Sequence, residues 1–131
     1  MPKFELRRLD VINGKQTFES LVVDEHDLLA EFESSLEERY RSEMRTLYAW
    51  MQMVADLCPV PGTIYHPLSD GKDGFREYEF KSKHLRIYAF AIARGKIIVM
   101  GGKKNRQRNY LRNFSGLKRQ YITYSNQYET D

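Results

Sequence analysis

The sequence predicts an α+β fold, with a small antiparallel sheet packed by an N-terminal helical hairpin and followed by a C-terminal helix. Three observations lead to this prediction. Strand-like runs occupy the first 23 residues and residues 75–102, an apolar stripe with helical spacing fills residues 28–54, and a second such stripe follows residue 102. With 131 residues, of which 41% are hydrophobic and 30% charged, the chain is expected to form one domain, residues 1–131.

Two strands are predicted near the start of the chain, at residues 3–12 and 17–23. The first run, KFELRRLDVI, alternates through Phe4 and Leu6 in the way that is typical of a strand. Asn13-Gly14 lies between the two runs and favours a tight hairpin turn, because both residues tolerate positive φ. The two strands are therefore expected to pair as a hairpin.

A long helical stripe follows these strands. Asp24 is the predicted N-cap, and Pro59 and Pro61 end the helical region. The stripe is longer than a typical helix, so two helices with a break near residues 38–42 are expected. Its apolar residues recur every three or four positions, and they are Leu28, Phe32, Leu36, Tyr40, Met44, Leu47, Met51 and Val54.

The second half of the chain predicts a turn, three strands and a helix. Residues 69–74, SDGKDG, form the turn, and the strands follow at 75–81, 84–93 and 96–102, with Arg94-Gly95 joining the last two. The final helix carries Tyr110 and Phe114 on its apolar side, and Ser115-Gly116 is a candidate interruption.

The cellular compartment is suggested by what the sequence lacks. No apolar run approaches 18 residues, so no membrane span and no membrane partner are expected. The first ten residues, MPKFELRRLD, do not resemble a secretion signal, and Cys58 alone cannot form an internal disulfide. These features favour a reducing interior, most simply the cytoplasm of a bacterium.

The charge is distributed unevenly along the chain. Residues 1–60 hold 12 acidic and 7 basic side chains, whereas residues 61–131 hold 6 acidic and 14 basic ones. Between Gly101 and Thr123 there are seven basic residues and no acidic one. This asymmetry favours a polyanionic partner on one face, and the alternative is a solvated charged helix.

The available chemistry points away from metals and cofactors. Three scattered histidines and one cysteine do not form a zinc pattern, and no phosphate loop or nucleophile elbow is present, so neither a metal nor a cofactor is expected. On the first of the three later strands Glu77, Glu79 and Lys81 share one face by alternation. Arg86 on the next strand could share that face, with Lys103 and Lys104 at the end of the third strand.

A sheet face with a carboxylate, cations and a phenol suits a cleavage reaction in which a 2′-hydroxyl of the RNA attacks the neighbouring phosphate. That reaction requires a base, cations for the charge on phosphate, and an acid for the leaving oxygen. Surface strands also carry such residues for solubility alone, and this alternative stays open.

The second half of the chain resembles a known family. Residues 102–110, GKKNRQRNY, are similar to the closing G-K-[RK]-x-R-x-x-x-Y segment of RelE-type toxins. Residues 68–90, LSDGKDGFREYEFKSKHLRIYAF, resemble the core motif of the RelE/ParE toxin superfamily, with the HigB-like branch the nearest match. The resemblance covers roughly residues 25–114, and the order of strand, two helices and three strands agrees with it. It implies a RelE-like fold and a type II toxin that is inhibited by a cognate antitoxin.

The resemblance also implies roles for single residues. Arg86 would hold the scissile phosphate, Lys104 would stabilise charge, Tyr110 would pack on the substrate, and Glu77 would be the catalytic carboxylate. Glu79 departs from the pattern, because the family usually has Arg or Lys there. In a working ribonuclease it would have to be neutralised by Arg86 or Lys81, or it would itself be the general base. Arg86 and Lys104 are expected at the sheet face or its exit, outside the apolar core. Additional substrate contacts are expected from Lys81, Lys103, Arg106 and Arg108.

Three functions therefore remain open. The first is a ribosome-dependent endoribonuclease, an mRNA interferase that cuts mRNA in the ribosomal A site and inhibits translation. The second is a ParE-like toxin that binds gyrase without catalysis, and the third is an inactive member that binds only RNA or antitoxin. In each case an acidic antitoxin segment is expected to cover the basic face between Lys81 and Arg112. For each residue a structural role, such as an Arg86 ion pair with Glu77 or Glu79, is the alternative.

Overall fold

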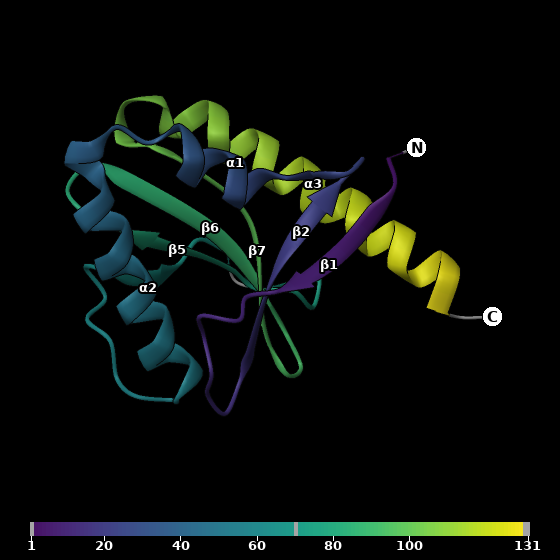
Figure 1. Ribbon diagram of the computed structural model, residues 1–131. Helices are drawn as coiled ribbons and strands as arrows, with labels where there is room; N and C mark the ends of the chain where they lie inside the picture. The colour runs from purple at the N-terminus through teal and green to yellow at the C-terminus, as the bar shows by residue number, and fades with distance from the viewer. Residues whose placement is uncertain (1, 70, 130–131) are drawn as a thin grey trace.

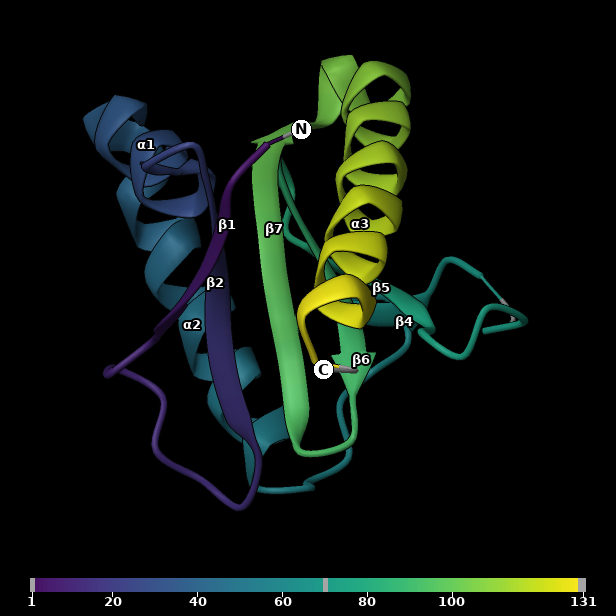
Figure 2. The same ribbon diagram turned by 90° about the vertical axis from the view of Figure 1, so that its right-hand side faces the viewer.

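The computed structural model describes residues 2–69 and 71–129, with side chains up to residue 126. One seven-stranded sheet has helices on both faces: α1 and α2 lie on one face and α3 on the other (Figures 1 and 2). The elements in chain order are β1 (Phe4–Arg8), β2 (Thr17–Val23), β3 (His26–Asp27), α1 (Leu28–Ser35), η1 (Glu38–Tyr40), α2 (Arg41–Ala55), β4 (Tyr65–Pro67), β5 (Glu77–Lys81), β6 (Leu85–Ile92), β7 (Gly95–Lys103), η2 (Lys104–Arg106) and α3 (Gln107–Glu129).

The strand order is β1-β2-β7-β6-β5-β4, and β3 pairs with β2. The α+β class and the C-terminal helix are confirmed, but the predicted antiparallel sheet is wrong in one respect. β2 and β7 are parallel, so the sheet is mixed. Parallel neighbours need a crossover, and the segment containing α1 and α2 carries the chain across the sheet face before β4–β7 are added.

The two helices do not stand at the N-terminus of the chain, because β1, β2 and β3 precede them. The predicted break between them is confirmed, since α1 ends at Ser35 and α2 begins at Arg41. Asp27, not Asp24, is the N-cap of α1, and its Oδ1 accepts a hydrogen bond from the Ala30 amide at 3.1 Å. Asp24 has a φ of 48° and Glu25 one of 70°, so both form the tight turn between β2 and β3.

The predicted Asn13-Gly14 hairpin turn is wrong. β1 ends at Arg8 and β2 begins at Thr17, so the two strands are joined by a longer loop. The Asn13 amide donates to Gln52 Oε1 at 3.0 Å, and Gln52 Nε2 donates to the Asn13 carbonyl at 2.7 Å. A Cβ on Gly14 would stand 2.6 Å from Asp56 Oδ1, so glycine serves close approach to the end of α2.

Both faces of the sheet are buried. Under α1 and α2 the core includes Phe18, Leu29, Leu47, Met51, Phe80, Leu85, Ile87 and Ile98. Under α3 it includes Phe4, Leu21, Tyr88, Phe90, Ile97, Val99 and Phe114. β6 contributes to both cores, and this explains its nearly continuous apolar sequence, LRIYAFAI.

The last helix runs without interruption from Gln107 to Glu129, through Ser115-Gly116. Gly71 and Gly74 have positive φ angles in the predicted turn over residues 69–74, of which residue 70 lies outside the described residues. Within residues 2–69 and 71–129 no helix is long and apolar enough to cross a membrane.

Candidate functional site

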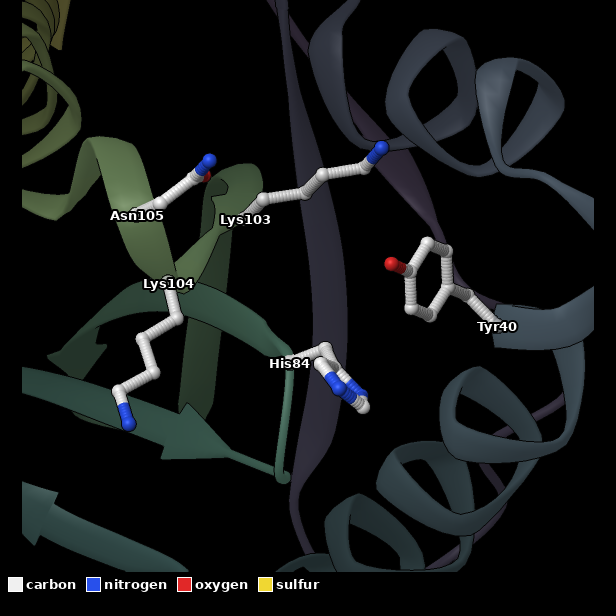
Figure 3. Close-up of a pocket in the computed structure, with 5 residues that line it drawn as sticks. All are labelled: Tyr40, His84, Lys103, Lys104 and Asn105. Atoms are coloured by element: carbon white, nitrogen blue, oxygen red, sulfur yellow. The ribbon is translucent and has the colours of Figure 1, made fainter.

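A basic pocket opens where the ends of β5, β6 and β7 meet the start of α2. It has a volume of about 350 Å³ and is lined by Tyr40, His84, Lys103, Lys104 and Asn105. These residues come from η1, the β5–β6 turn, the end of β7 and η2, so the pocket joins segments far apart in sequence (Figure 3). We call this set the basic pocket.

His84 is held in place by a carboxylate from α2. Its Nδ1 lies 2.7 Å from Glu43 Oε2, and its backbone amide donates to Glu43 Oε1 at 2.9 Å. The Ser82 hydroxyl donates to the same Oε1. Burial raises the pKa of the Glu43 carboxyl, but the hydrogen bonds from Ser82 and His84 outweigh it, so that the pKa lies below its ordinary value.

Glu43 orients the His84 ring through Nδ1. A carboxylate can only accept hydrogen bonds, so Nδ1 carries the hydrogen of this contact, and in the neutral imidazole Nε2 is the nitrogen with the lone pair. The imidazole is thereby prepared to take a proton through Nε2, in the way that a carboxylate orients a histidine base in many enzymes.

Tyr40 and Lys103 form the opposite side of the pocket. The Tyr40 ring centroid lies 5.2 Å from that of His84, and the Lys103 ammonium lies 5.1 Å from the centre of the Tyr40 ring. Lys103 Nζ also meets Glu37 Oε1 at 3.1 Å, and its hydrogen bond lowers the pKa of the Glu37 carboxyl. The Tyr40 hydroxyl points into the space among the labelled residues (Figure 3).

Lys104 and Asn105 lie on η2, directly after β7. The Lys104 amide donates to the His84 carbonyl at 2.9 Å, and this bond ties the two lining segments together. The Lys104 side chain is exposed, and no carboxylate among the described residues forms an ion pair with it. Figure 3 shows its ammonium turned away from Tyr40. Arg106 and Arg108 continue the exposed basic surface onto the start of α3.

Arg86 does not line the basic pocket. Only 7% of it is exposed, so the expected position outside the core is wrong. Its Nη1 donates to the carbonyls of Ser82 at 2.7 Å and Leu85 at 2.8 Å. Its Nε is buried without a hydrogen-bond partner among the described residues, as is the Tyr88 hydroxyl. Arg86 therefore braces the turn that carries His84.

Glu77 lies under α3 and faces a buried lysine. Lys118 Nζ lies 3.3 Å from Glu77 Oε2 and 2.7 Å from Asp73 Oδ2, and the Ser115 hydroxyl donates to Glu77 at 3.2 Å. Burial raises the pKa of the Asp73 carboxyl, but the hydrogen bonds from Lys118 and from the Phe75 amide outweigh it. The pKa therefore lies below its ordinary value. Glu77 thus anchors the helix to the sheet.

Glu79 is also covered by α3. It is 2% exposed, Gln107 Nε2 donates to its Oε2 at 2.6 Å, and His66 Nε2 lies 3.2 Å from its Oε1. Neither Arg86 nor Lys81 forms an ion pair with Glu79 among the described residues, so that expectation is wrong; its two oxygens meet His66 and Gln107 instead. Lys81 pairs in register with Arg86 on the neighbouring strand.

Tyr110 packs its ring on the backbone of Gly102. A Cβ at Gly102 would stand 2.2 Å from two ring carbons of Tyr110, so only glycine allows this contact. Tyr110 is partly buried among the apolar residues beneath α3. Tyr110 is therefore a packing residue, and it holds the first turn of α3 against the end of β7.

The structure therefore brings two of the predicted site residues, Lys103 and Lys104, into one pocket, whereas Arg86, Glu77 and Tyr110 do not line it. The sequence reasoning missed Tyr40, Glu43, His84 and Asn105. Asn105 lies inside the predicted basic segment and could have been included. Glu43 and His84 are 41 residues apart, and no spacing rule connects them.

A metal ion is not supported by the geometry of the described part of the chain. In residues 2–69 and 71–129 no group of three or more His, Cys, Asp and Glu side chains is close enough to hold one.

Comparison with protein-family models, with curated proteins and with solved structures finds no match for this chain.

Proposed function

We propose that this chain is an endoribonuclease that cuts mRNA at the basic pocket, and that it acts as the toxin of a type II toxin–antitoxin pair. The observation that carries the proposal is the basic pocket, which is lined by a histidine held by a carboxylate, by a tyrosine and by two lysines. This combination supplies a base, cations and an acid, which is what cleavage by an RNA 2′-hydroxyl requires.

The reaction assigns one step to each group. His84 Nε2 removes the proton from the 2′-hydroxyl, the 2′-oxygen forms a bond to phosphorus, and the bond from phosphorus to the 5′-oxygen breaks. Lys103 and Lys104 stabilise the negative charge that grows on the phosphate oxygens. The Tyr40 hydroxyl, which points into the pocket, gives its proton to the leaving 5′-oxygen. The products are a 2′,3′-cyclic phosphate and a free 5′-hydroxyl.

Substrate binding uses the surface around the pocket. Lys104, Arg106 and Arg108 are exposed and follow one another along η2 and the start of α3. Exposed cations in a row suit the phosphates of a single RNA strand. This arrangement supports RNA as the partner of the basic half of the chain.

The element order gives further support to the toxin proposal. β2, then α1 and α2, then β5, β6 and β7 follow one another in the order that the resemblance to RelE-type toxins implies. The resemblance adds the ribosomal A site as the place of cleavage and a cognate antitoxin as the inhibitor. An acidic antitoxin segment would cover the exposed cations between Lys81 and Arg112.

The test is cleavage of ribosome-bound mRNA by the purified chain, with the ends of the products analysed. We expect 2′,3′-cyclic phosphate ends, and we expect His84→Gln to lower the rate by about 100-fold to 10,000-fold, the usual effect of losing a general base. Lys83→Gln is the matched control, since Lys83 is exposed and adjacent to His84, and it should leave the rate unchanged. A parent chain that cleaves no RNA, or a His84→Gln variant as fast as the parent, would refute the proposal.

A second candidate function is supported by one observation. Glu77 and Glu79 are covered by α3, and Arg86 is buried with its Nη1 bonded to the backbone of the β5–β6 turn. The resemblance makes this face catalytic, so its burial favours a member that binds RNA or an antitoxin without cutting. Binding of RNA by the parent with no cleavage would support this candidate. In growing cells, loss of thymidine incorporation before methionine incorporation would instead point to gyrase.

A further inference from the structure

β1 leaves one backbone edge of the sheet open. The Leu9 amide donates to the Phe18 carbonyl, and the Asp24 amide donates to the Lys3 carbonyl, so odd-numbered residues of this strand bond to β2. In an antiparallel pair, every second residue of a strand directs its amide and carbonyl to the partner strand, and the residues between them direct theirs to the other side. The amides and carbonyls of Phe4, Leu6 and Arg8 therefore point away from β2, toward the open edge.

The opposite edge of the sheet is blocked, whereas this one is not. β4 has three residues and includes Pro67, which has no amide hydrogen. β1 has five residues, FELRR, without proline or glycine. Figure 2 shows β1 running along its edge between α1 on one side and α3 on the other. An open edge of this kind is a surface on which another strand can pair.

The side chains of β1 are exposed where a second strand would reach them. Leu6 is 37% exposed and is one of the few large apolar side chains of the described residues left at the surface. Glu5, Arg7 and Arg8 are also exposed. The strand thus presents an apolar residue at its centre with charges of both signs beside it.

We infer that two copies of this chain associate through antiparallel pairing of their β1 strands, centred on Leu6. In this register Leu6 faces Leu6 of the second copy, and Phe4 faces Arg8. All three residues have the outward backbone groups that such pairing needs. Glu5 of each copy then faces Arg7 of the other, and opposite charges that face each other across strands are stabilising.

The charges exclude the neighbouring registers. A shift of the pairing by two residues in one direction places Arg7 opposite Arg7 of the second copy. A shift in the other direction places Glu5 opposite Glu5, and Lys3 opposite Arg7. Like charges in direct opposition are destabilising, so the register centred on Leu6 is the one that the sequence of β1 favours.

The strength of the association follows from its size. Five paired residues in each copy make a small interface. Arg7 also forms a salt bridge of 3.1 Å with Asp27 in its own chain, which weakens its attraction to Glu5 of the second copy. We therefore expect a dimer that forms in the micromolar range and weakens in high salt. No residue of β1 lines the basic pocket, so the inference does not depend on the ribonuclease proposal.

The test is sedimentation of the parent chain and two variants from low to high micromolar concentration. Leu6→Pro removes an outward amide hydrogen and no bond to β2, since proline is tolerated on edge strands. It should stay monomeric, and Leu6→Thr, which keeps the amide, should still dimerise. Glu5→Lys should weaken the dimer, whereas Glu38→Lys, an equal charge change on η1, should not. Circular dichroism checks that each variant is folded.

Cross-linking tests the register directly. Residues in a hydrogen-bonded antiparallel pair have Cα atoms about 5.5 Å apart, within the range of a disulfide. Leu6→Cys, made together with Cys58→Ser, should therefore form a covalent dimer on oxidation. Val11→Cys with Cys58→Ser is the control, since Val11 is 69% exposed but outside β1. A monomeric parent at every concentration, an unaffected Leu6→Pro, or equal cross-linking at Val11 would overturn the inference, as would β1 pairing only with a different protein.

Discussion

Replacing Lys118 by methionine tests whether α3 is anchored to the sheet by charge. Lys118 is 2% exposed, although it is a lysine, and its ammonium lies between Asp73 on the β4–β5 loop and Glu77 on β5. Methionine keeps most of the aliphatic stem, so the packing changes little. The effect of the substitution therefore reports on the loss of the charge.

The size of the effect follows from the exposure of the two carboxylates. Leaving one buried charge without its partner costs about 3–5 kcal/mol. The Asp73 side chain is 47% exposed and regains water, whereas that of Glu77 is 14% exposed and, among the described residues, keeps the Ser115 hydroxyl as its side-chain partner. We therefore expect a loss of about 2–3 kcal/mol in the free energy of unfolding, or about 7–11 °C in the melting temperature for a domain of this size.

Denaturant unfolding measures this loss, with Arg119→Met as the matched control. Arg119 is the next residue on α3 and is exposed, so its replacement should change the stability by less than about 0.5 kcal/mol. The double variant Lys118→Met with Glu77→Gln should recover part of the loss, because no charge then stays buried alone. A Lys118→Met variant as stable as the parent would show that Glu77 is hydrated in solution and does not anchor the helix.

Two further predictions concern the glycines around α3 and the carboxylate behind His84. Gly102→Ala forces the Tyr110 ring to move and should cost about 1–3 kcal/mol, whereas Gly116→Ala, which meets no atom within 4 Å, should stabilise the helix by about 0.5–1 kcal/mol in the same unfolding assay. The lowered pKa of Glu43 contributes stability that is complete above the ordinary carboxyl pKa and is lost as the pH falls through the folded value. Glu43→Gln should therefore flatten the acid side of the curve of stability against pH, and an unchanged curve would contradict the role assigned to Glu43.

Much of the fold could be predicted because local sequence determines it. The alternation and apolar runs of β5, β6 and β7 are read directly from the chain, and the break between α1 and α2 follows from the length of the stripe. The parallel contact between β2 and β7 could not be predicted from local sequence, since it joins residues such as Phe18 and Lys96 that are far apart in sequence. Asn13-Gly14 failed as a turn signal because Gly14 is required by its contact with Asp56, which no local pattern reveals.

The site was predicted only where one segment supplies it. Lys103 and Lys104 were found because the basic run after β7 is visible in the sequence. Glu43 and His84 meet because the start of α2 packs near the β5–β6 turn, and this depends on the whole sheet being assembled. Sequence alternation correctly placed Glu77 and Glu79 on one face, but it could not show that α3 covers that face.

The burial of Glu79 changes how the charges of the second half are understood. In the sequence its carboxylate stands on a face expected to meet RNA, where it would repel phosphate. In the fold Gln107 and His66 bind both of its oxygens and α3 excludes it from the surface, while Lys104, Arg106 and Arg108 stay exposed beside the basic pocket. Glu77 is likewise matched to Lys118. The acidic side chains of β5 therefore hold the helix in place, and Lys104, Arg106 and Arg108, which form no ion pair with a described carboxylate, make up the attractive surface. The carboxylate that fits the family resemblance least is thus explained by the packing of α3.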